Sequence, residues 1–216
     1  MTDEKRAYRM NRRAELEEQT RLRITESAVA LHGTLGPSRS SISAIAEHAR
    51  VRRSTVYRHF SDESALFAAC SSHWMAANPL PDLSGWAMIS DVDERQLRAL
   101  QELYSYYRRT EPMMANIHRD EEIMPIVKQM MSGYRRYLAD ARETLMAGRH
   151  LDRSAQKRVR AAIGHVLAFP VWRSLAIDQA LNDRECVDLM FAPVAAAQLK
   201  PTVPFTNRRL SGKHQA

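Results

Sequence analysis

Seven of the eight residues from Arg52 to His59 carry polar side chains that can contact a polyanion. The stretch reads RRSTVYRH. An arginine can bind guanine through two hydrogen bonds, and a threonine offers base edges a hydroxyl and a methyl group. Arginine, tyrosine and histidine can also reach phosphate oxygens. Val56 and Phe60 are four residues apart and give the segment one apolar face. The alternative, a solvated helix face, would not need polar hydrogen-bonding groups concentrated at the start of the helix. The spacing favours a short helix that is held by one face and presents the other to nucleic acid.

The elements that must position this segment are short helices. Apolar residues at three- and four-residue steps predict a helix from about Glu15 to Thr34. The sequence GTLGPSRSS then interrupts it, because glycine and proline break regular structure. Ser41 is a natural N-cap for a second helix, Ile42 to His48. The third helix starts within residues 52–60, and a fourth follows the N-cap candidate Asp62 and runs to about Ala76. A long helix followed by two short ones joined by a tight turn predicts a helix-turn-helix.

Residues 21–67 resemble the DNA-binding domain of the TetR family of transcriptional regulators. The family pattern falls without gaps on Ile24, Ala28, Gly36, Ser40–Ser41, Ile45–Ala46, Val51, Thr55, Tyr57, Phe60 and Leu66–Phe67. The expected DNA-contacting residues are Arg39, Ser41, Ser43, Arg52, Arg53, Ser54, Thr55, Tyr57, Arg58 and His59. The resemblance implies a homodimer that assembles through its last two long helices. It also implies a ligand pocket in the larger domain, where an effector changes the separation of the two recognition helices.

Three residues depart from the family pattern. Arg50 replaces the glycine of the turn, so a positive φ there would strain an arginine. Arg52 replaces the serine that usually caps the recognition helix, and an arginine cannot accept an amide hydrogen bond. Glu63 replaces a lysine that often binds phosphate. We expect Arg50, Arg52 and Arg53 to take over the neutralisation of the DNA backbone, which would steepen the salt dependence of binding.

Beyond the sequence NPLPDLSG (residues 78–85) the helices are longer and their inner faces are rich in methionine and aromatic residues. Pro112 and Pro125 mark places where helices can begin, and Pro170 should kink the helix that starts near residue 154. The inner faces have two interpretations, a plain core or a pocket for an apolar ligand. The candidate ligand-binding residues are Tyr104, Tyr107, Met114, His118, Met130, Met131, Tyr134, His165, Phe169 and Trp172.

Composition bounds the remaining possibilities. The 216 residues carry 12 Lys/Arg against 7 Asp/Glu in residues 1–60, 16 against 18 in 61–199, and 4 against none in 200–216. Basic character is thus placed at the two ends, as in proteins that bind nucleic acid. Two cysteines 116 positions apart form no metal or redox motif and fit a reducing cytoplasm. No apolar run is long enough to cross a membrane, and no Ser/His/Asp set, paired carboxylates or phosphate loop indicates an enzyme.

The sequence therefore predicts an all-α protein in four parts. Residues 1–20 form a flexible basic extension, which either contacts DNA as an arm or is disordered. Residues 21–78 form a three-helix helix-turn-helix DNA-binding domain, residues 86–199 a larger helical ligand-binding and dimerisation domain, and residues 200–216 a disordered basic tail. The predicted function is a cytoplasmic repressor, without cofactor or metal, that leaves a palindromic operator when it binds a small, largely apolar ligand. The alternatives are a ligand-independent or activating regulator, or a helical small-molecule-binding protein whose basic N-terminus is incidental.

Overall fold

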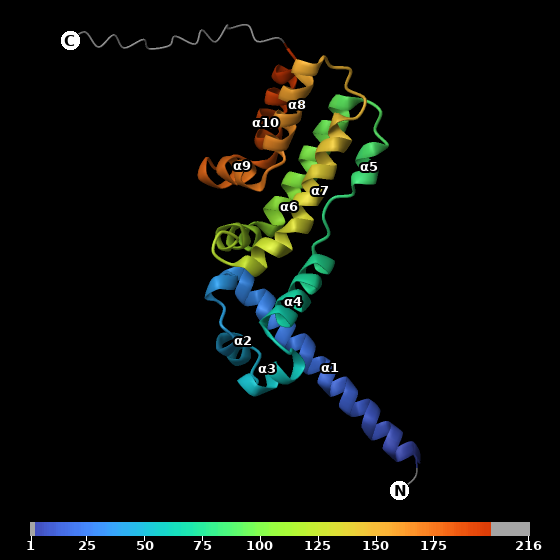
Figure 1. Ribbon diagram of the computed structural model, residues 1–216, viewed down its shortest axis with the longest axis vertical. Coiled ribbons are helices and arrows are strands. Elements are labelled where there is room, and N and C mark those ends of the chain that lie inside the picture. Colours follow the sequence, from blue (N-terminus) through green and yellow to red (C-terminus); the bar gives the residue numbers. More distant parts are fainter. Residues whose placement is uncertain (1–2, 200–216) are drawn as a thin grey trace, which may run out of the picture.

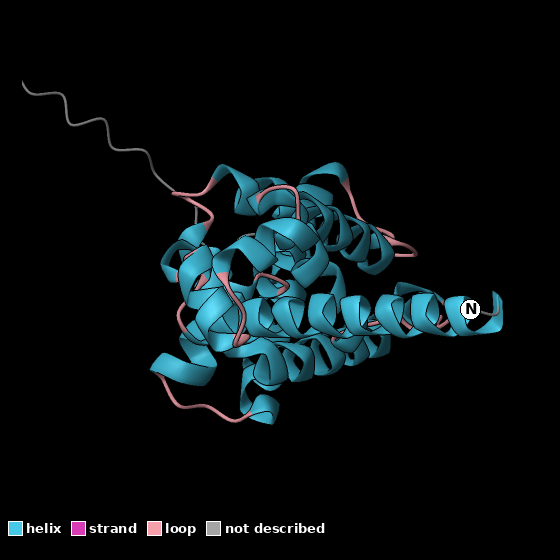
Figure 2. Ribbon diagram, turned by 90° about the horizontal axis from the view of Figure 1, so that it is seen from below, coloured by secondary structure: helices cyan, strands magenta, loops and turns pink. Residues whose placement is uncertain are grey.

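A computed structural model describes residues 3–199, and every regular element within this range is helical (Figure 2). The all-α class predicted from the sequence is confirmed. The elements are α1 (Asp3–Thr34), the 3₁₀-helix η1 (Pro37–Arg39), α2 (Ile42–His48), α3 (Arg53–His59), α4 (Glu63–Ala77), α5 (Leu83–Ala87), α6 (Val92–Asp120), α7 (Pro125–Met146), α8 (Arg153–Val166), α9 (Phe169–Arg173), the π-helix η2 (Ser174–Asp178) and α10 (Asp183–Gln198). The predicted basic tail, residues 200–216, lies outside the described residues. No helix among the described residues is long and apolar enough to cross a membrane.

Helices α1 to α4 form a small N-terminal unit at one end of an elongated molecule (Figure 1). Its core is closed by apolar side chains from all four helices: Ile24, Ala28, Ile42, Ile45, Ala46, Ala49, Val56, Phe60, Leu66 and Cys70. The two N-caps expected at Ser41 and Asp62 are present, because each side chain accepts a hydrogen bond from a backbone amide three residues on. Helices α2 and α3 are therefore held against α1 and α4 by their apolar faces, and their polar faces point outward.

The larger unit is built around α6, which lies beside α7, α9 and α10 (Figure 1). Helices α8 and α10 pack on each other, and α8 also contacts α7. The largest fully buried side chains of this unit are Trp86, Leu100, Leu103, Tyr104, Tyr107, Leu145, Ile163, Phe169 and Trp172. The apolar periodicity of the long helices thus gives one continuous core on the far side of the molecule from α3.

Helix α1 begins earlier than the sequence analysis placed it. It starts at Asp3 rather than near Glu15, so the segment predicted as a flexible extension is helical from Asp3 onward. Residues 8–19 are all exposed and project past α3 (Figures 1 and 2). The physical reason is composition, because the segment contains no glycine or proline and is rich in arginine and glutamate, which favour helices. An ion pair between Arg13 and Glu17, one turn apart, adds a small contribution.

The prolines act differently from one another. Pro125 is the first residue of α7, as expected. Pro112 does not start a helix but lies inside α6, whose last turns run in a different direction from the rest in Figure 1. The predicted kinked helix around Pro170 is instead interrupted: α8 ends at Val166, and Pro170 lies in the first turn of α9. A proline in a first turn needs no amide donor, so ending one helix and starting another costs less than an interior kink.

The end of α6 holds the end of α1 through a polar cluster. The Asn116 side chain donates hydrogen bonds to the carbonyls of His32 (3.1 Å) and Gly33 (2.9 Å), and Arg119 donates to the carbonyl of Leu35 (2.8 Å). These carbonyls are at the C-terminus of α1, where a helix leaves its last acceptors without intrahelical partners. The α6 side chains therefore cap α1 from the other unit.

Asp120, the last residue of α6, completes this cluster. Its carboxylate is fully buried and accepts hydrogen bonds from the Ser38 amide (2.9 Å) and the Arg119 guanidinium (2.8 Å). Burial alone would raise the pKa of Asp120, but these hydrogen bonds hold it below its ordinary value. Gly36 allows the close approach, since its φ is 93° and a Cβ there would collide with Arg119 and lie 2.7 Å from the Asp120 carboxylate.

We expect Gly36→Ala to lower the free energy of unfolding by more than about 2 kcal/mol, because the new methyl group both strains the backbone and breaks a buried polar cluster. Chemical denaturation followed by circular dichroism measures the change. Gly133→Ala is the matched control: it lies inside α7, and a Cβ there meets nothing within 4 Å. The control should gain up to about 1 kcal/mol from helix propensity. Equal effects at the two glycines would contradict this account of the junction.

Candidate nucleic-acid interface and ligand cavity

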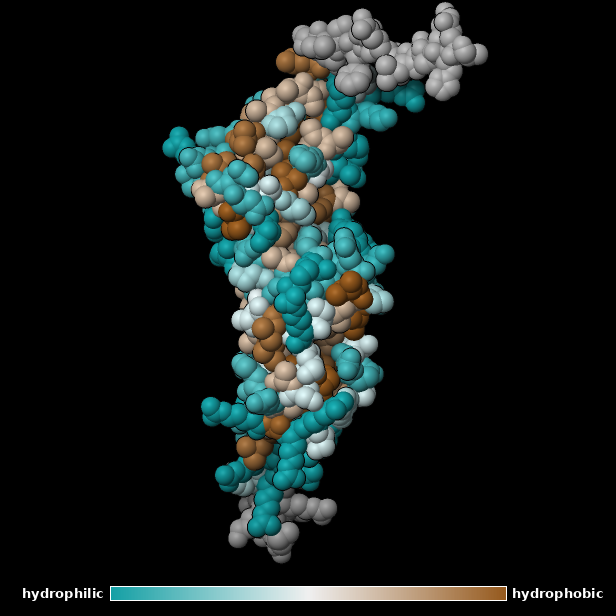
Figure 3. Space-filling model, turned by 90° about the vertical axis from the view of Figure 1, so that its left-hand side faces the viewer, coloured by the Kyte–Doolittle hydropathy of each residue, from teal (hydrophilic) through white to brown (hydrophobic). Residues whose placement is uncertain are grey.

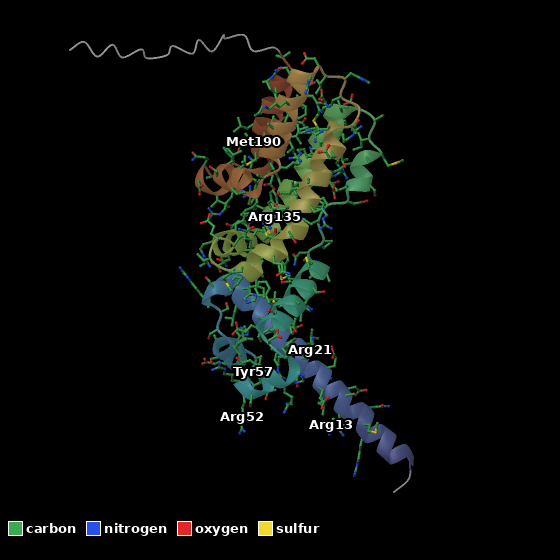
Figure 4. All side chains as sticks on the ribbon, in the orientation of Figure 1. Arg13, Arg21, Arg52, Tyr57, Arg135 and Met190 are labelled. Atoms are coloured by element: carbon green, nitrogen blue, oxygen red, sulfur yellow. The ribbon has the colours of Figure 1, made fainter. Side chains whose placement is uncertain are left out.

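Helix α3 presents a polar surface at the end of the molecule opposite α8 and α10 (Figure 4). Val56 and Phe60 are buried in the N-terminal core, while Arg52, Arg53, Ser54, Tyr57 and Arg58 are exposed. Arg53 donates a hydrogen bond to the Tyr57 hydroxyl (3.2 Å) and its guanidinium lies 5.6 Å from the centre of the tyrosine ring. These contacts hold the Arg53 guanidinium in place as a hydrogen-bond donor on the exposed face of α3.

The other predicted contact residues divide into two groups. Arg39, Ser41 and Ser43 are exposed on η1 and at the start of α2, and Thr55 is half-buried on α3. His59 differs from the rest, because its Nε2 atom is buried without a hydrogen-bond partner and burial lowers its pKa. Its carbonyl accepts a hydrogen bond from Arg21 of α1. His59 therefore belongs to the contact between α3 and α1 rather than to the open face.

Sequence reasoning missed Arg21. Its Nη1 atom lies 2.6 Å from the His59 carbonyl, and its guanidinium stacks 4.3 Å from the centre of the Phe60 ring. The residue thus fixes the C-terminal end of α3 on α1. Arg21 lies three residues before Ile24, so both side chains are on the same face of α1. This spacing was the sequence signal that could have identified Arg21.

The turn between α2 and α3 has the geometry that we expected from the two arginines, Arg50 and Arg52, that replace a glycine and a serine of the family pattern. Arg50 has a φ of 54°, which confirms a left-handed arginine where a glycine would be unstrained. Arg52 is the N-cap of α3, with extended backbone angles and no side-chain hydrogen bond to the helix. Ser41 caps α2 from nearly the same backbone conformation. Helix α3 therefore starts with an uncapped turn whose arginines face outward.

A cavity of about 280 Å³ lies between the two units. It is lined by four α-helices, by η1 and by the connection after α4: Val29 and His32 of α1; Pro37 of η1; Phe67, Cys70, Ser71, Trp74 and Met75 of α4; Asn78 and Leu80 of the connection; Tyr106, Met113, Met114 and Ile117 of α6; and Val127, Met130, Met131, Gly133 and Tyr134 of α7. Methionine and aromatic side chains dominate, and no Asp, Glu, Lys or Arg lines it. Its chemistry suits a small apolar molecule.

Four of the ten predicted ligand residues line this cavity: Met114, Met130, Met131 and Tyr134. Five others lie together in the core beside it. Tyr104, Tyr107, Phe169 and Trp172 form an aromatic cluster with ring centres 5.3 to 6.3 Å apart, and His118 stacks on Phe169 at 4.8 Å. Two of their hydroxyls are engaged inside the chain, since Tyr104 donates to the Val166 carbonyl and Tyr107 to the Leu167 carbonyl. The indole Nε1 of Trp172 is buried without a hydrogen-bond partner among the described residues. His165 is exposed on the outer face of α8.

His32 and Cys70 are cavity residues that sequence reasoning missed. Both come from the N-terminal unit, whereas the search for ligand residues covered the larger domain. The cysteine was expected to be a small buried group, and burial raises the pKa of its thiol to about 11. No group of three His, Cys, Asp or Glu side chains within residues 3–199 is arranged to hold a metal ion.

Residues 24–70 match the family described as bacterial regulatory proteins, tetR family. No curated protein sequence matches the chain. Sixteen solved chains match it in structure.

Three of these structures illustrate the likeness. A proposed fatty acid metabolism regulator from Clostridium perfringens has a TM-score of 0.62 at 14% identity, over 83% of this chain and 100% of that one. A proposed TetR-family regulator from Mesorhizobium loti MAFF303099 has a TM-score of 0.59 at 16% identity, over 84% and 96%. A transcriptional regulator from Rhodococcus sp. Rha1 has a TM-score of 0.55 at 15% identity, over 84% and 99%. At these identities the likeness establishes the fold.

Arg52→Ser should raise the free energy of unfolding by about 1 kcal/mol, because a serine in this backbone conformation accepts an amide hydrogen bond at the start of α3. Thermal and chemical denaturation measure the gain. Arg52→Ala removes the same charge without adding a cap and serves as the control. If serine and alanine stabilise the chain equally, charge repulsion among the arginines, and not the missing cap, is the dominant cost at this position.

Proposed function

We propose that this chain, whose residues 24–70 form a DNA-binding domain of the tetR family, is a dimeric repressor that leaves a palindromic operator when it binds a small, uncharged and largely apolar ligand. The observation that carries the proposal is the pairing of an exposed polar face on α3 with a separate apolar cavity between the two units. The fold is that of transcriptional regulators and not of an enzyme family. Repression, release and the contact residues are the proposed parts.

DNA binding is assigned to the start of α3. A helix of this size enters the major groove with its N-terminal residues nearest the base edges. Arg52, Arg53 and Arg58 supply phosphate and guanine contacts, and Thr55 lies in the first turn of the helix, where it can reach a base edge. Arg39, Ser41 and Ser43 on the neighbouring elements are suited to the flanking phosphates.

Dimerisation is assigned to α8 and α10. On α10 the exposed residues Leu189, Ala192, Ala196 and Leu199 recur at three- and four-residue spacing, which makes an apolar stripe. Ala161 is exposed on α8, and alanines allow a second helix pair to approach closely. Figure 3, seen from the side on which α9 and α10 lie, shows hydrophobic side chains among hydrophilic ones on this half and around the middle of the molecule, and mainly hydrophilic side chains toward the opposite end. This distribution supports self-association at one end and DNA binding at the other.

Release follows from the location of the cavity. Two half-sites read by a dimer lie about 34 Å apart along the DNA, or a multiple of that distance. Because α1 and α4 line the cavity together with α6 and α7, a ligand that changes how these helices pack changes the placement of α3. The ligand then weakens DNA binding by the ratio of its affinities for the two arrangements.

The operator test uses a short palindromic duplex taken from beside the gene of this protein. Arg58→Ala should weaken binding to every duplex and reduce the slope of log affinity against log salt by about 1, whereas Thr55→Ala should cost roughly 1–3 kcal/mol at one base position and relax the preference there. Electrophoretic mobility shift with single-base variants measures both. Arg136→Ala on α7, an exposed arginine away from α3, is the matched control and should change neither quantity. Equal binding of operator and scrambled duplexes would exclude sequence-specific regulation.

The dimer test measures molar mass in solution by light scattering. The unmodified chain should have the mass of a dimer, and Leu189→Glu should raise the dimer dissociation constant at least tenfold, because it places a charge in the apolar stripe. Ile123→Glu is the control, since Ile123 is exposed between α6 and α7, away from the stripe. A monomeric unmodified chain, or equal effects of the two substitutions, would contradict the assignment.

A further inference from the structure

His32 is the buried polar group that the cavity presents to a ligand. It lies in the last turns of α1, is 7% exposed, and its ring stacks 5.3 Å from the ring of Phe67. Burial lowers the pKa of His32 to about 4, against a weaker opposing effect of Asp120, so the imidazole is neutral at physiological pH. A neutral imidazole has one donor nitrogen and one acceptor nitrogen.

The contacts of Cys70 indicate which of the two ring nitrogens of His32 carries the hydrogen. The Cys70 Sγ atom donates its only hydrogen to the Phe67 carbonyl, 3.2 Å away. The same sulfur lies 3.5 Å from Nδ1 of His32. With the thiol hydrogen directed at the Phe67 carbonyl, we assign the imidazole hydrogen to Nδ1, which donates it to the sulfur. The other nitrogen, Nε2, is then a lone-pair acceptor, and no described residue donates a hydrogen bond to it.

Two other polar groups of the cavity are engaged within the protein. The Ser71 hydroxyl donates to the Met130 sulfur (3.3 Å). The Tyr134 hydroxyl lies 2.6 Å from the Tyr107 hydroxyl, and Tyr107 donates its hydrogen to the Leu167 carbonyl, so the hydrogen between the two tyrosines comes from Tyr134. Asn78 also lines the cavity and donates to the Trp74 carbonyl (2.9 Å), and the Tyr106 hydroxyl completes its polar lining. The Nε2 lone pair of His32 is a buried acceptor in this cavity that a ligand hydroxyl can satisfy.

We propose that the cavity selects an uncharged alcohol or phenol, whose hydroxyl donates to His32 Nε2 and whose apolar body packs among the methionines of α6 and α7. A carboxylate is excluded by its charge, because no cationic side chain lines the cavity to compensate for its desolvation. An ether is disfavoured because it can only accept. Cys70 acts as a positioning residue that fixes the imidazole tautomer. The inference rests on the proposed function in taking this cavity as the effector site.

The test compares three probes on the full chain without DNA: 4-butylphenol, its methyl ether 4-butylanisole, and 4-butylbenzoate. Calorimetry and thermal shift give the affinities. We expect the phenol to bind about tenfold more tightly than the ether, the factor for one hydrogen bond to a buried acceptor, and the benzoate to give no detectable binding. Equal affinities for phenol and ether, binding of the benzoate, or no binding of the phenol up to its solubility limit would overturn the proposal.

Substitutions separate the role of each residue. His32→Leu should bring the phenol-to-ether ratio close to 1, while His32→Gln keeps an acceptor oxygen and should preserve a preference for the phenol. Cys70→Ala releases the tautomer and should lower the ratio with the imidazole still present. Cys70→Ser retains both a donor for the Phe67 carbonyl and an acceptor for Nδ1, so it should keep the ratio. A ratio unchanged in both Cys70→Ala and His32→Leu would show that neither residue reads the ligand.

Operator binding distinguishes this inference from the proposed function. Preferential binding of 4-butylphenol without any effect on the operator complex would support the ligand class and contradict ligand-induced release. Release of the operator by 4-butylbenzoate with equal potency would support release and contradict the ligand class.

Discussion

The buried carboxylate of Asp120 is the constraint on which the arrangement of the two units depends. Asp120 is the last residue of α6. Its carboxylate accepts a hydrogen bond from the Ser38 amide, which lies between α1 and α2. It also accepts one from Arg119, whose guanidinium donates to the Leu35 carbonyl after the end of α1. A buried charge without these partners would be strongly unfavourable, so the carboxylate and the turn around Gly36 stabilise each other. The same helix lines the cavity one and two turns earlier, at Met113, Met114 and Ile117. The C-terminal part of α6 therefore both lines the cavity and holds the N-terminal unit.

Local signals were sufficient for the three shorter helices of the N-terminal unit, α2, α3 and α4. Gly36, Pro37 and the caps at Ser41 and Asp62 mark its helix ends, and the observed bounds of α2, α3 and α4 agree with them within a residue. The same reasoning was less successful for the prolines, because whether Pro112 or Pro170 starts, bends or separates helices depends on the neighbours available to the freed carbonyls. It also placed the start of α1 too late, since a helix of polar residues lacks the apolar periodicity by which helices are found.

The candidate sites differ in how far the sequence describes them. The polar face of α3 is contiguous in sequence, so one short segment contains most of it. The cavity is assembled from residues as distant as Val29 and Tyr134. Periodicity showed that Tyr104 and Tyr107 face inward, but it does not distinguish an inward side chain that meets another helix from one that meets empty space. That distinction is a property of tertiary packing, and it is also why His32 and Cys70 were not anticipated.

A cavity shared by two units has a thermodynamic consequence for any measurement of ligand affinity. If occupancy alters how tightly the dimer holds DNA, DNA must alter the affinity for the ligand by the same factor, because the two equilibria form a closed cycle. The operator would then behave as an antagonist of the effector without approaching the cavity. The ligand concentration at half-saturation would depend on how much operator the solution contains, and the ratio between the two limits would give the coupling directly.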